Sequence, residues 1–110
     1  MKNNGEWKYA EFSSFSLDTE GNMYRLSVFG YTGDAGDMMG FHHGMSFSTP
    51  EVDNDAASNF DCASYLQSGW WYRDCNRCDL NGKYGYGVHW STLTGSTSSL
   101  KETRMMIREP

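Results

Sequence analysis

The sequence predicts a single loop-rich domain that combines a small antiparallel sheet with an irregular polar subdomain. Its 110 residues are enough for one domain with a modest core. Two segments near the N-terminus alternate apolar and polar residues, which is typical of half-buried strands. The chain also has 12 Gly, and 15% of its residues are aromatic, so bulky rings must fill the interior between many turns. This profile suits a secreted, loop-rich domain better than a helical bundle.

The first elements that we expect are the two strands of a β-hairpin. Residues 7–17, WKYAEFSSFSL, are aromatic and partly alternating, and residues 23–29, MYRLSVF, alternate again. Between them, DTEGN at residues 18–22 has the composition of a turn. Residues 30–44, GYTGDAGDMMGFHHG, carry five glycines and no clear period, which predicts a loop with at most a short helical turn.

The remaining segments are less regular. Residues 48–81 contain many turn formers, which predicts a subdomain held by something other than sheet hydrogen bonds. After GYGVHW, at residues 85–90, a serine- and threonine-rich turn is expected at 91–99. In SLKETRMMIREP, Met105 and Ile107 have the spacing of a final strand.

Charge and motifs exclude several classes of protein. The formal charge is −5 with a pI near 5.0, and the basic residues form no stripe, so nucleic acid is not an expected partner. No apolar run approaches the roughly 18 residues that span a bilayer, and the first residues, MKNNGEW, are too polar for the apolar part of a signal peptide. The chain has no nucleophile elbow, no H-E-x-x-H and no glycine-rich phosphate loop, so we do not expect an enzyme.

Three cysteines allow three pairings, and one thiol must stay free or bridge to another chain. A bridge from Cys62 to Cys75 would close a loop for which chain entropy predicts about 3 kcal/mol. A bridge from Cys75 to Cys78 would be a C-x-x-C pattern, which elsewhere indicates a redox or zinc site. The lack of a second such pair argues against zinc. The residue pattern leaves the pairing open.

An acidic stretch includes Glu51, Asp53 and Asp55. Calcium takes six to eight oxygen ligands in flexible geometry, and alternate carboxylates can point toward one centre. The stretch is not an EF-hand, because it lacks that motif's Gly and Glu. The alternative interpretation is a solvated polar turn.

Aromatic and histidine pairs raise a similar choice between core and site. In GWWY, residues 69–72, we expect at least one tryptophan in the core, whereas an exposed one could stack on a sugar or anchor a peptide. His42 and His43 are adjacent, so on a strand they would face opposite ways and could not bind one metal. We expect one to be structural and the other to face solvent.

Taken in order, these segments resemble the C-terminal globular domain of fibrinogen and of fibrinogen-related proteins such as ficolins, tachylectins, angiopoietins and tenascins. The resemblance covers nearly the whole chain and is carried by YRLSVFGYTGDAGD, HHGMSFST, the acidic DND, CA, GWWY, LNG and SLKETRMMIR. It implies a compact α+β, fibrinogen C-terminal-like fold in one shortened domain. Residues 1–47 and 98–110 would form a small antiparallel sheet, and residues 48–97 a calcium- and disulfide-stabilised binding subdomain.

The resemblance also implies a disulfide and a metal site. The cysteines that flank the tandem tryptophan are paired in the family, which implies a Cys62–Cys75 bridge and leaves Cys78 as a free thiol or in an intermolecular bridge. The acidic loop corresponds to the family's calcium site. The implied ligands are two carboxylates and two nearby backbone carbonyls: Asp53, Asp55, Ala57 and Asn59.

In lectin members of the family, calcium supports a pocket for the acetyl group of N-acetylated sugars, beside a cis peptide that would here join Asp74 to Cys75. The implied ligand-binding residues are Tyr65, Leu66, Asp74, Cys75, Asn76 and Tyr86. Asn76 stands where the family commonly has a donor His, and Leu66 stands where it has an aromatic wall. This chain also departs from the family in the short KYGY segment after LNG, and it begins about halfway through a typical domain.

The function implied is calcium-dependent recognition of acetylated glycans, such as N-acetylglucosamine on microbial surfaces, by a secreted protein of innate immune pattern recognition. The alternative is a protein- or peptide-binding module of the fibrinogen or angiopoietin type with structural calcium. Oligomers would form through regions outside this chain.

Overall fold

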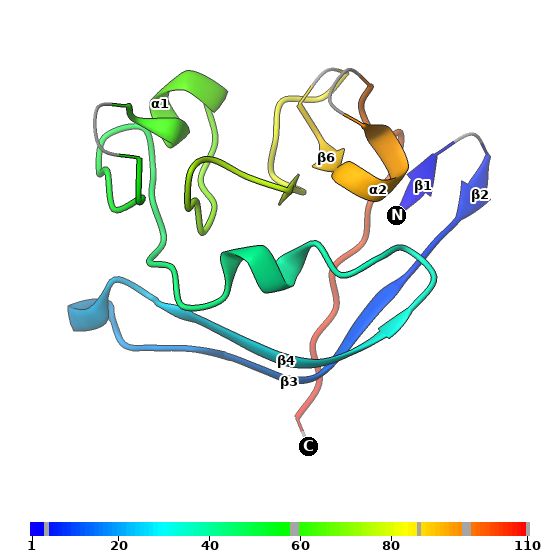
Figure 1. Ribbon diagram of the computed structural model, residues 1–110, viewed down its shortest axis with the longest axis horizontal. Helices are drawn as coiled ribbons and strands as arrows, with labels where there is room; N and C mark the ends of the chain where they lie inside the picture. Colours follow the sequence, from blue (N-terminus) through cyan, green and yellow to red (C-terminus); the bar gives the residue numbers. More distant parts are fainter. Residues whose placement is uncertain (4, 58–59, 86, 96–97, 110) are drawn as a thin grey trace.

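The computed structural model describes residues 1–3, 5–57, 60–85, 87–95 and 98–109. Within these ranges, short strands form two-stranded antiparallel sheets, β1–β2, β3–β4 and β5–β6, joined by long connections and a few helical turns (Figure 1). In chain order the elements are β1 (Lys2–Asn3), β2 (Glu6–Trp7), β3 (Ala10–Leu17), the 3-10 helix η1 (Glu20–Asn22), β4 (Leu26–Gly33), the 3-10 helix η2 (Met39–His42), α1 (Cys62–Leu66), β5 (Cys78–Asp79), β6 (His89–Trp90) and α2 (Ser91–Thr94).

The predicted hairpin is the pair β3–β4, in which Leu17 pairs with Leu26 next to the turn and Ala10 pairs with Gly33 at the far end. Its inner face carries the apolar residues of β4, and η2 packs across it. The second strand extends past the expected end at Phe29. The helical turn expected in the following loop is η2.

The first strand begins later than predicted, because Trp7 pairs with Lys2 in the separate β1–β2 sheet. The hairpin turn contains η1 and two residues with positive φ, Met23 at 55° and Tyr24 at 54°. This left-handed conformation reverses the chain between two strands of opposite direction.

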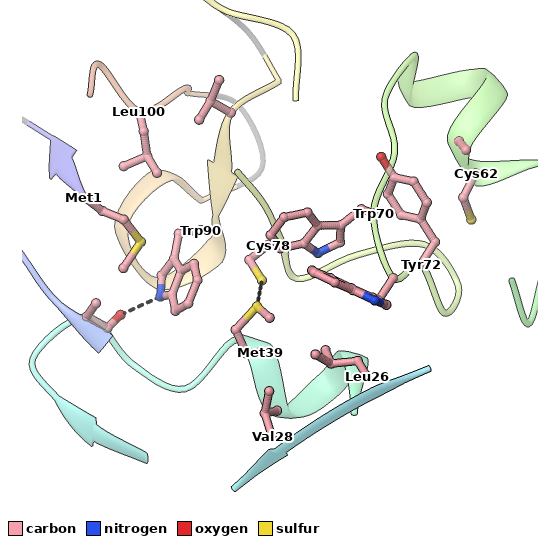
Figure 2. Packing of buried hydrophobic residues seen from close by; sticks show 14 residues of the cluster. Met1, Leu26, Val28, Met39, Cys62, Trp70, Tyr72, Cys78, Trp90 and Leu100 are labelled. Carbon is pink, nitrogen blue, oxygen red and sulfur yellow. Dashed lines mark hydrogen bonds between the residues drawn. The ribbon is translucent and has the colours of Figure 1, made fainter. Parts of the chain in front are cut away.

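The core lies between the hairpin and the segments that cross over its inner face (Figure 2). Both tryptophans and the tyrosine of GWWY are buried, so the core interpretation of this motif is confirmed for more than the one tryptophan expected. Trp90 closes the other end of the core, where its Nε1 donates to the carbonyl oxygens of Ala35 at 3.1 Å and Gly36 at 3.0 Å. The core is therefore built largely from aromatic rings, as the composition predicted.

The prediction of a final strand was wrong. Residues 103–109 contain no strand, and the C-terminal segment joins the β1–β2 sheet through a backbone bridge between Lys2 and Glu102 and a contact of Arg104 with the Trp7 ring. Met105 is 53% exposed and Ile107 83% exposed. Met106 lies between them, so the segment lacks the strict alternation that would bury one face of a strand. In the described ranges, no helix is long and apolar enough to cross a membrane.

The prediction that one histidine is structural and the other faces solvent is confirmed for the first and only partly for the second. His42 is fully buried and structural, whereas His43 is half-buried and its Nδ1 accepts a hydrogen bond from the Val28 N–H at 3.2 Å. His43 therefore supports the edge of β4 and does not simply face solvent.

Candidate ligand- and metal-binding site

A disulfide joins Cys62, the first residue of α1, to Cys75, with the two Cα atoms 5.4 Å apart. It encloses the buried GWWY segment and so fixes α1 against the core. Cys78 is a free, fully buried thiol that lies 3.4 Å from the sulfur of Met39 (Figure 2). Burial, and next the neighbouring carboxyl of Asp79, raise the pKa of this thiol. An intermolecular bridge through Cys78 does not fit a side chain enclosed in the core.

The acidic loop is anchored to the core on both sides. Ser48 and Trp70 exchange backbone hydrogen bonds of 2.9 and 3.2 Å, and the Ser48 hydroxyl accepts from the Asn54 N–H at 2.9 Å. Farther along, the Ala56 N–H donates to the carbonyl oxygen of Arg73 at 2.8 Å. The loop is therefore held beside the disulfide, although it contains no regular strand.

Three carboxylates converge in this loop. Asp53, Asp55 and Asp61 each offer an oxygen, and these oxygens lie within 4.8 Å of one another. Calcium–oxygen distances of roughly 2.3–2.6 Å place opposite ligands of one ion about 5 Å apart. The donor set is therefore compatible with one calcium ion.

Asp55 is the centre of this cluster. Its Oδ1 accepts from the Ala57 N–H at 2.9 Å and its Oδ2 from the Cys62 N–H at 2.9 Å. Burial raises the pKa of Asp55, the two N–H donors oppose that rise, and the adjacent Asp53 carboxyl adds to it. Each oxygen retains a second lone pair for a metal. A bound cation would relieve the repulsion between these carboxyl groups.

Asp61 was not among the predicted ligands. It is the N-cap of α1, where its Oδ1 accepts from the Ser64 N–H at 3.0 Å. An acidic residue just before the first cysteine was a signal that sequence reasoning could have used. Of the two predicted carbonyl ligands, Ala57 lies next to Asp55 through its N–H, and Asn59 lies outside the described residues.

A hollow of about 540 Å³ lies between the end of α1 and α2. It is lined by Leu66, Asn76, Gly87, His89, Ser91, Gly95 and Ser98. The fold thus brings together two residues of the predicted ligand site, Leu66 from α1 and Asn76 from the segment after the disulfide. None of the lining residues is acidic, Lys or Arg.

Three other predicted ligand-binding residues, Tyr65, Asp74 and Cys75, are not among the lining residues of the hollow. Tyr65 is 71% exposed and stacks near Phe60, with ring centroids 5.1 Å apart. Asp74 is exposed and Cys75 is half-buried in the disulfide. Tyr86 lies outside the described residues.

The cis peptide implied between Asp74 and Cys75 was wrong, because no peptide bond in the described ranges is cis. A non-proline cis bond costs roughly 3 kcal/mol and needs surroundings that enforce it. Here the bond between Asp74 and Cys75 is trans, and the Arg73 N–H donates to the Cys75 carbonyl oxygen at 2.9 Å.

Sequence reasoning missed three polar lining residues, His89, Ser91 and Ser98. His89 Nε2 lies 3.1 Å from the Ser91 hydroxyl, and His89 Nδ1 lies 2.9 Å from the Thr94 hydroxyl. Burial lowers the pKa of His89, so the ring is neutral near pH 7. A turn was expected at residues 91–99 and no element was predicted at 85–90, and no local pattern distinguishes a turn serine that faces a hollow from one that faces solvent.

A second hollow of about 430 Å³ lies at the hairpin, lined in part by Asp18, Arg25 and Phe29. It contains none of the predicted site residues, so we centre the candidate site on the hollow beside the acidic loop.

Comparison with known proteins identifies relatives along the whole chain. A family model described as fibrinogen beta and gamma chains, C-terminal globular domain, matches residues 1–110. The chain is 45% identical over 102 residues to fibrinogen C domain-containing protein 1-A of Xenopus laevis, covering 86% of this chain and 22% of that protein. It is 36% identical over 113 residues to tenascin-R of Homo sapiens, covering 98% of this chain and 8% of that protein.

Solved structures of fibrinogen-like domains have the same fold. The fibrinogen-like globe domain of human ANGPTL6 superposes with a TM-score of 0.83 at 36% identity, over 88% of this chain and 48% of that chain. Lamprey fibrin D-dimer, complexed with the peptide Gly-His-Arg-Pro-amide, gives a TM-score of 0.81 at 35% identity, over 88% of this chain and 39% of that chain. The chain therefore spans about half or less of these solved chains, and about a fifth or less of the two curated relatives.

Proposed function

Because this chain belongs to the family of fibrinogen C-terminal globular domains, whose members are non-catalytic binding modules, we propose that it recognises acetylated glycans outside the cell with calcium bound at its acidic loop. The observation that carries the proposal is the hollow of about 540 Å³ that both Leu66 and Asn76 line. An apolar side chain and an amide suit the methyl and carbonyl of an acetyl group. The uncharged lining suits a neutral sugar.

The acidic loop is connected to this hollow through α1. Asp61 is the N-cap of α1, and Asp55 accepts a hydrogen bond from the N–H of Cys62, the first residue of α1. Leu66, the last residue of α1, lines the hollow. In our proposal, Asp53, Asp55 and Asp61 hold calcium, with the carbonyl oxygens of Ala57 and Asn59 as further ligands. The bound ion would neutralise the carboxylates and so fix the position of α1.

A peptide is the alternative ligand, because the lamprey relative is complexed with Gly-His-Arg-Pro-amide. That peptide is basic, and a basic peptide needs carboxylates in its pocket. No described residue that lines the hollow is acidic, which favours the neutral acetylated sugar. A protein partner of different charge remains the second candidate.

Secretion and a role in innate immune pattern recognition belong to the same proposal. The Cys62–Cys75 disulfide supports an oxidising compartment, because disulfides persist mainly outside the cytosol. Higher avidity for a microbial surface would require several copies, joined through regions outside this chain.

The test is retention on N-acetylglucosamine beads with calcium and with chelator. We expect calcium-dependent retention that free N-acetylglucosamine releases, and a loss of at least severalfold in Asn76→Ala. The matched control is Asn22→Ala, an exposed asparagine of η1 on the hairpin, which should bind like the wild type. Absence of retention in calcium would reject the glycan proposal and direct the search to protein partners.

A further inference from the structure

We propose that the hollow at the hairpin turn is a second ligand site, which takes a sugar unit bearing one carboxylate. Arg25 binds the carboxylate, and Phe29 packs against the sugar ring. This hairpin hollow has a volume of about 430 Å³, and none of the described residues that line it also lines the hollow of Leu66 and Asn76. In Figure 1 the hairpin turn and α2 lie on opposite sides of the molecule. The inference goes beyond the proposed function, because it requires neither an acetyl group nor calcium.

The hairpin hollow lies on the outer face of β3 and β4. Side chains alternate between the two faces of a strand, and the buried Leu26 and Val28 of β4 belong to the inner face. Ser27 and Phe29 therefore point outward, and Ser16, the cross-strand partner of Ser27, shares their face. All three outward residues line the hollow.

His43 and Gly44 form its side wall. The Gly44 N–H donates to the Leu26 carbonyl oxygen at 2.8 Å, and the Val28 N–H donates to His43 Nδ1 at 3.2 Å, so this segment is hydrogen-bonded along the edge of β4. Because a backbone N–H can only donate, Nδ1 is the acceptor and the ring proton lies on Nε2. This Nε2–H has no hydrogen-bond partner among the described residues, so it is a donor available to a ligand.

Arg25 supplies the positive charge of the hollow. Its guanidinium makes no hydrogen bond or ion pair with any residue that the structure describes, so all five of its N–H donors are available. The hydroxyls of Ser16 and Ser27 also have no partner within the described ranges. A lining with so many available donors suits a ligand rich in oxygen atoms, with hydroxyl groups for the serines and an oxyanion for the guanidinium.

Asp18, which also lines the hollow, limits the charge that the ligand can carry. Its N–H donates to the Arg25 carbonyl oxygen at 3.0 Å, but the two side chains form no ion pair. Instead, its Oδ1 accepts from the Thr19 N–H at 2.7 Å and its Oδ2 from Asn22 Nδ2 at 3.1 Å, and these hydrogen bonds lower the pKa of Asp18. The ionised Asp18 would repel a phosphate monoester, with its two charges, more than a singly charged carboxylate. A carboxylate also matches the planar fork of a guanidinium.

Phe29 supplies the apolar surface. Its side chain is 56% exposed, and its ring centroid lies 4.6 Å from that of His43. Its cross-strand partner is Ser14, whose short side chain leaves the ring uncovered. Ligand sites commonly combine such an aromatic surface with a few polar groups, and the C–H face of a sugar can pack on the ring while its hydroxyls reach those groups. Ring, guanidinium and hydroxyls together match a sugar acid of the uronate class.

The experiment compares the methyl glycosides of glucuronic acid and of glucose, in which a carboxylate and a hydroxymethyl group occupy the same position. Binding to the isotope-labelled full chain is followed by NMR at matched ionic strength. We expect the glucuronide to bind roughly 5- to 10-fold more tightly than the glucoside and to shift the backbone signals of Ser27, Phe29 and His43. Arg25→Gln should remove this preference. Asp18→Asn should tighten the glucuronide alone, roughly twofold, because it removes a like charge.

Phe29→Ser should weaken both sugars. The matched control is Arg108→Gln, which removes the same charge from an exposed position outside the lining and should bind like the wild type. Equal affinity of the wild type for the two sugars, no binding of either, or a preference that survives in Arg25→Gln would overturn the inference. Glucuronide-induced shifts confined to the hollow of Leu66 and Asn76 would overturn it as well. Because neither sugar carries an acetyl group, retention on N-acetylglucosamine beads tests the proposed function separately.

Discussion

His42 joins η2 to the disulfide-bonded segment through a hydrogen bond of 2.8 Å from its Nδ1–H to the carbonyl oxygen of Trp71. Its Nε2 accepts from the backbone N–H groups of Arg77 at 3.1 Å and Cys78 at 3.3 Å. These two donors require an unprotonated Nε2, so the proton of the neutral ring lies on Nδ1. One buried ring thus links three backbone segments, and protonation of Nε2 would break two of these hydrogen bonds.

The neutral state of His42 predicts acid sensitivity. Burial, and secondarily the charges of Arg73 and Arg77, lower the pKa of His42 to about 4, against the opposing hydrogen bond to Trp71. In the unfolded chain His42 takes up a proton near pH 6.5, whereas in the native state it does so only near pH 4. The neutral ring therefore contributes fully to the free energy of unfolding above pH 6.5, and this contribution is lost as the pH falls from 6.5 to 4. The full effect is about 3 kcal/mol. Urea unfolding from pH 7.5 to 4.5 measures it.

His42→Gln should be less stable at pH 7.5 and should lose most of the pH dependence assigned to this ring. His43→Gln retains the buried ring and is the matched control, so its slope should follow the wild type. An unchanged slope in His42→Gln would contradict this prediction.

The buried carboxyl group of Asp79 predicts that stability depends on pH with the opposite sign. This carboxyl group is 1% exposed, and its Oδ2 accepts from the Tyr72 hydroxyl at 2.6 Å and the Ser68 hydroxyl at 2.7 Å. Burial raises the pKa of Asp79, although these donors oppose the rise. The native state therefore binds the proton more tightly than the unfolded chain, and this contribution is lost as pH rises through the native pKa.

Asp79→Asn should remove that dependence. Its amide would accept from the two hydroxyls but would place an N–H₂ group against the Asn81 N–H, which now donates to Oδ1 at 3.1 Å. We expect a loss of about 1–3 kcal/mol at neutral pH, measured by urea unfolding. A variant as stable as the wild type would show that the buried network tolerates the added donor.

Calcium should stabilise the chain through its three converging carboxylates. For an affinity of roughly 0.1–1 mM, 5 mM calcium adds about 1–2 kcal/mol to the free energy of unfolding, seen as a rise of several degrees in Tm. Asp53→Ala and Asp55→Asn should abolish the rise, and Asp61→Asn should reduce it. Glu51→Gln is the control with the same charge change outside the cluster, and it should respond to calcium like the wild type. If Asp61→Asn responds fully, Asp61 is only a helix cap.

Labelling with a thiol reagent should distinguish the free cysteine, Cys78, from the two cysteines of the disulfide. In the native chain Cys78 should not react with a thiol reagent, because its side chain is buried and its pKa is raised. In denaturant without reductant, mass spectrometry should detect one modified thiol, and the Cys62–Cys75 bridge should remain intact. Reaction of the native chain, or a disulfide-linked dimer, would place Cys78 at the surface.

Several features could be predicted from the sequence because they depend on local order. The alternation in residues 7–17 and 23–29 predicts the hairpin, which the structure forms from residues 10–17 and 26–33, and the aromatic GWWY motif predicts core. The resemblance implied the Cys62–Cys75 pair, and the acidic spacing indicated Asp53 and Asp55. Alternation does not specify a pairing partner, and residues 103–109 pair with no described strand, so the expected C-terminal strand was wrong.

The composition and motif order of the sequence by themselves determined a small, aromatic-cored, non-catalytic domain of the fibrinogen family with an acidic loop. Only the tertiary structure decided which residues face one another. It placed Asp61 against Asp53 and Asp55, and it brought His89 and Ser91 to the hollow that Leu66 and Asn76 line. The acidic residues lie close together in the chain but converge only through the path of their loop, and the lining residues of the hollow come from separate segments. Their geometry depends on how the chain packs, which no local period or spacing encodes.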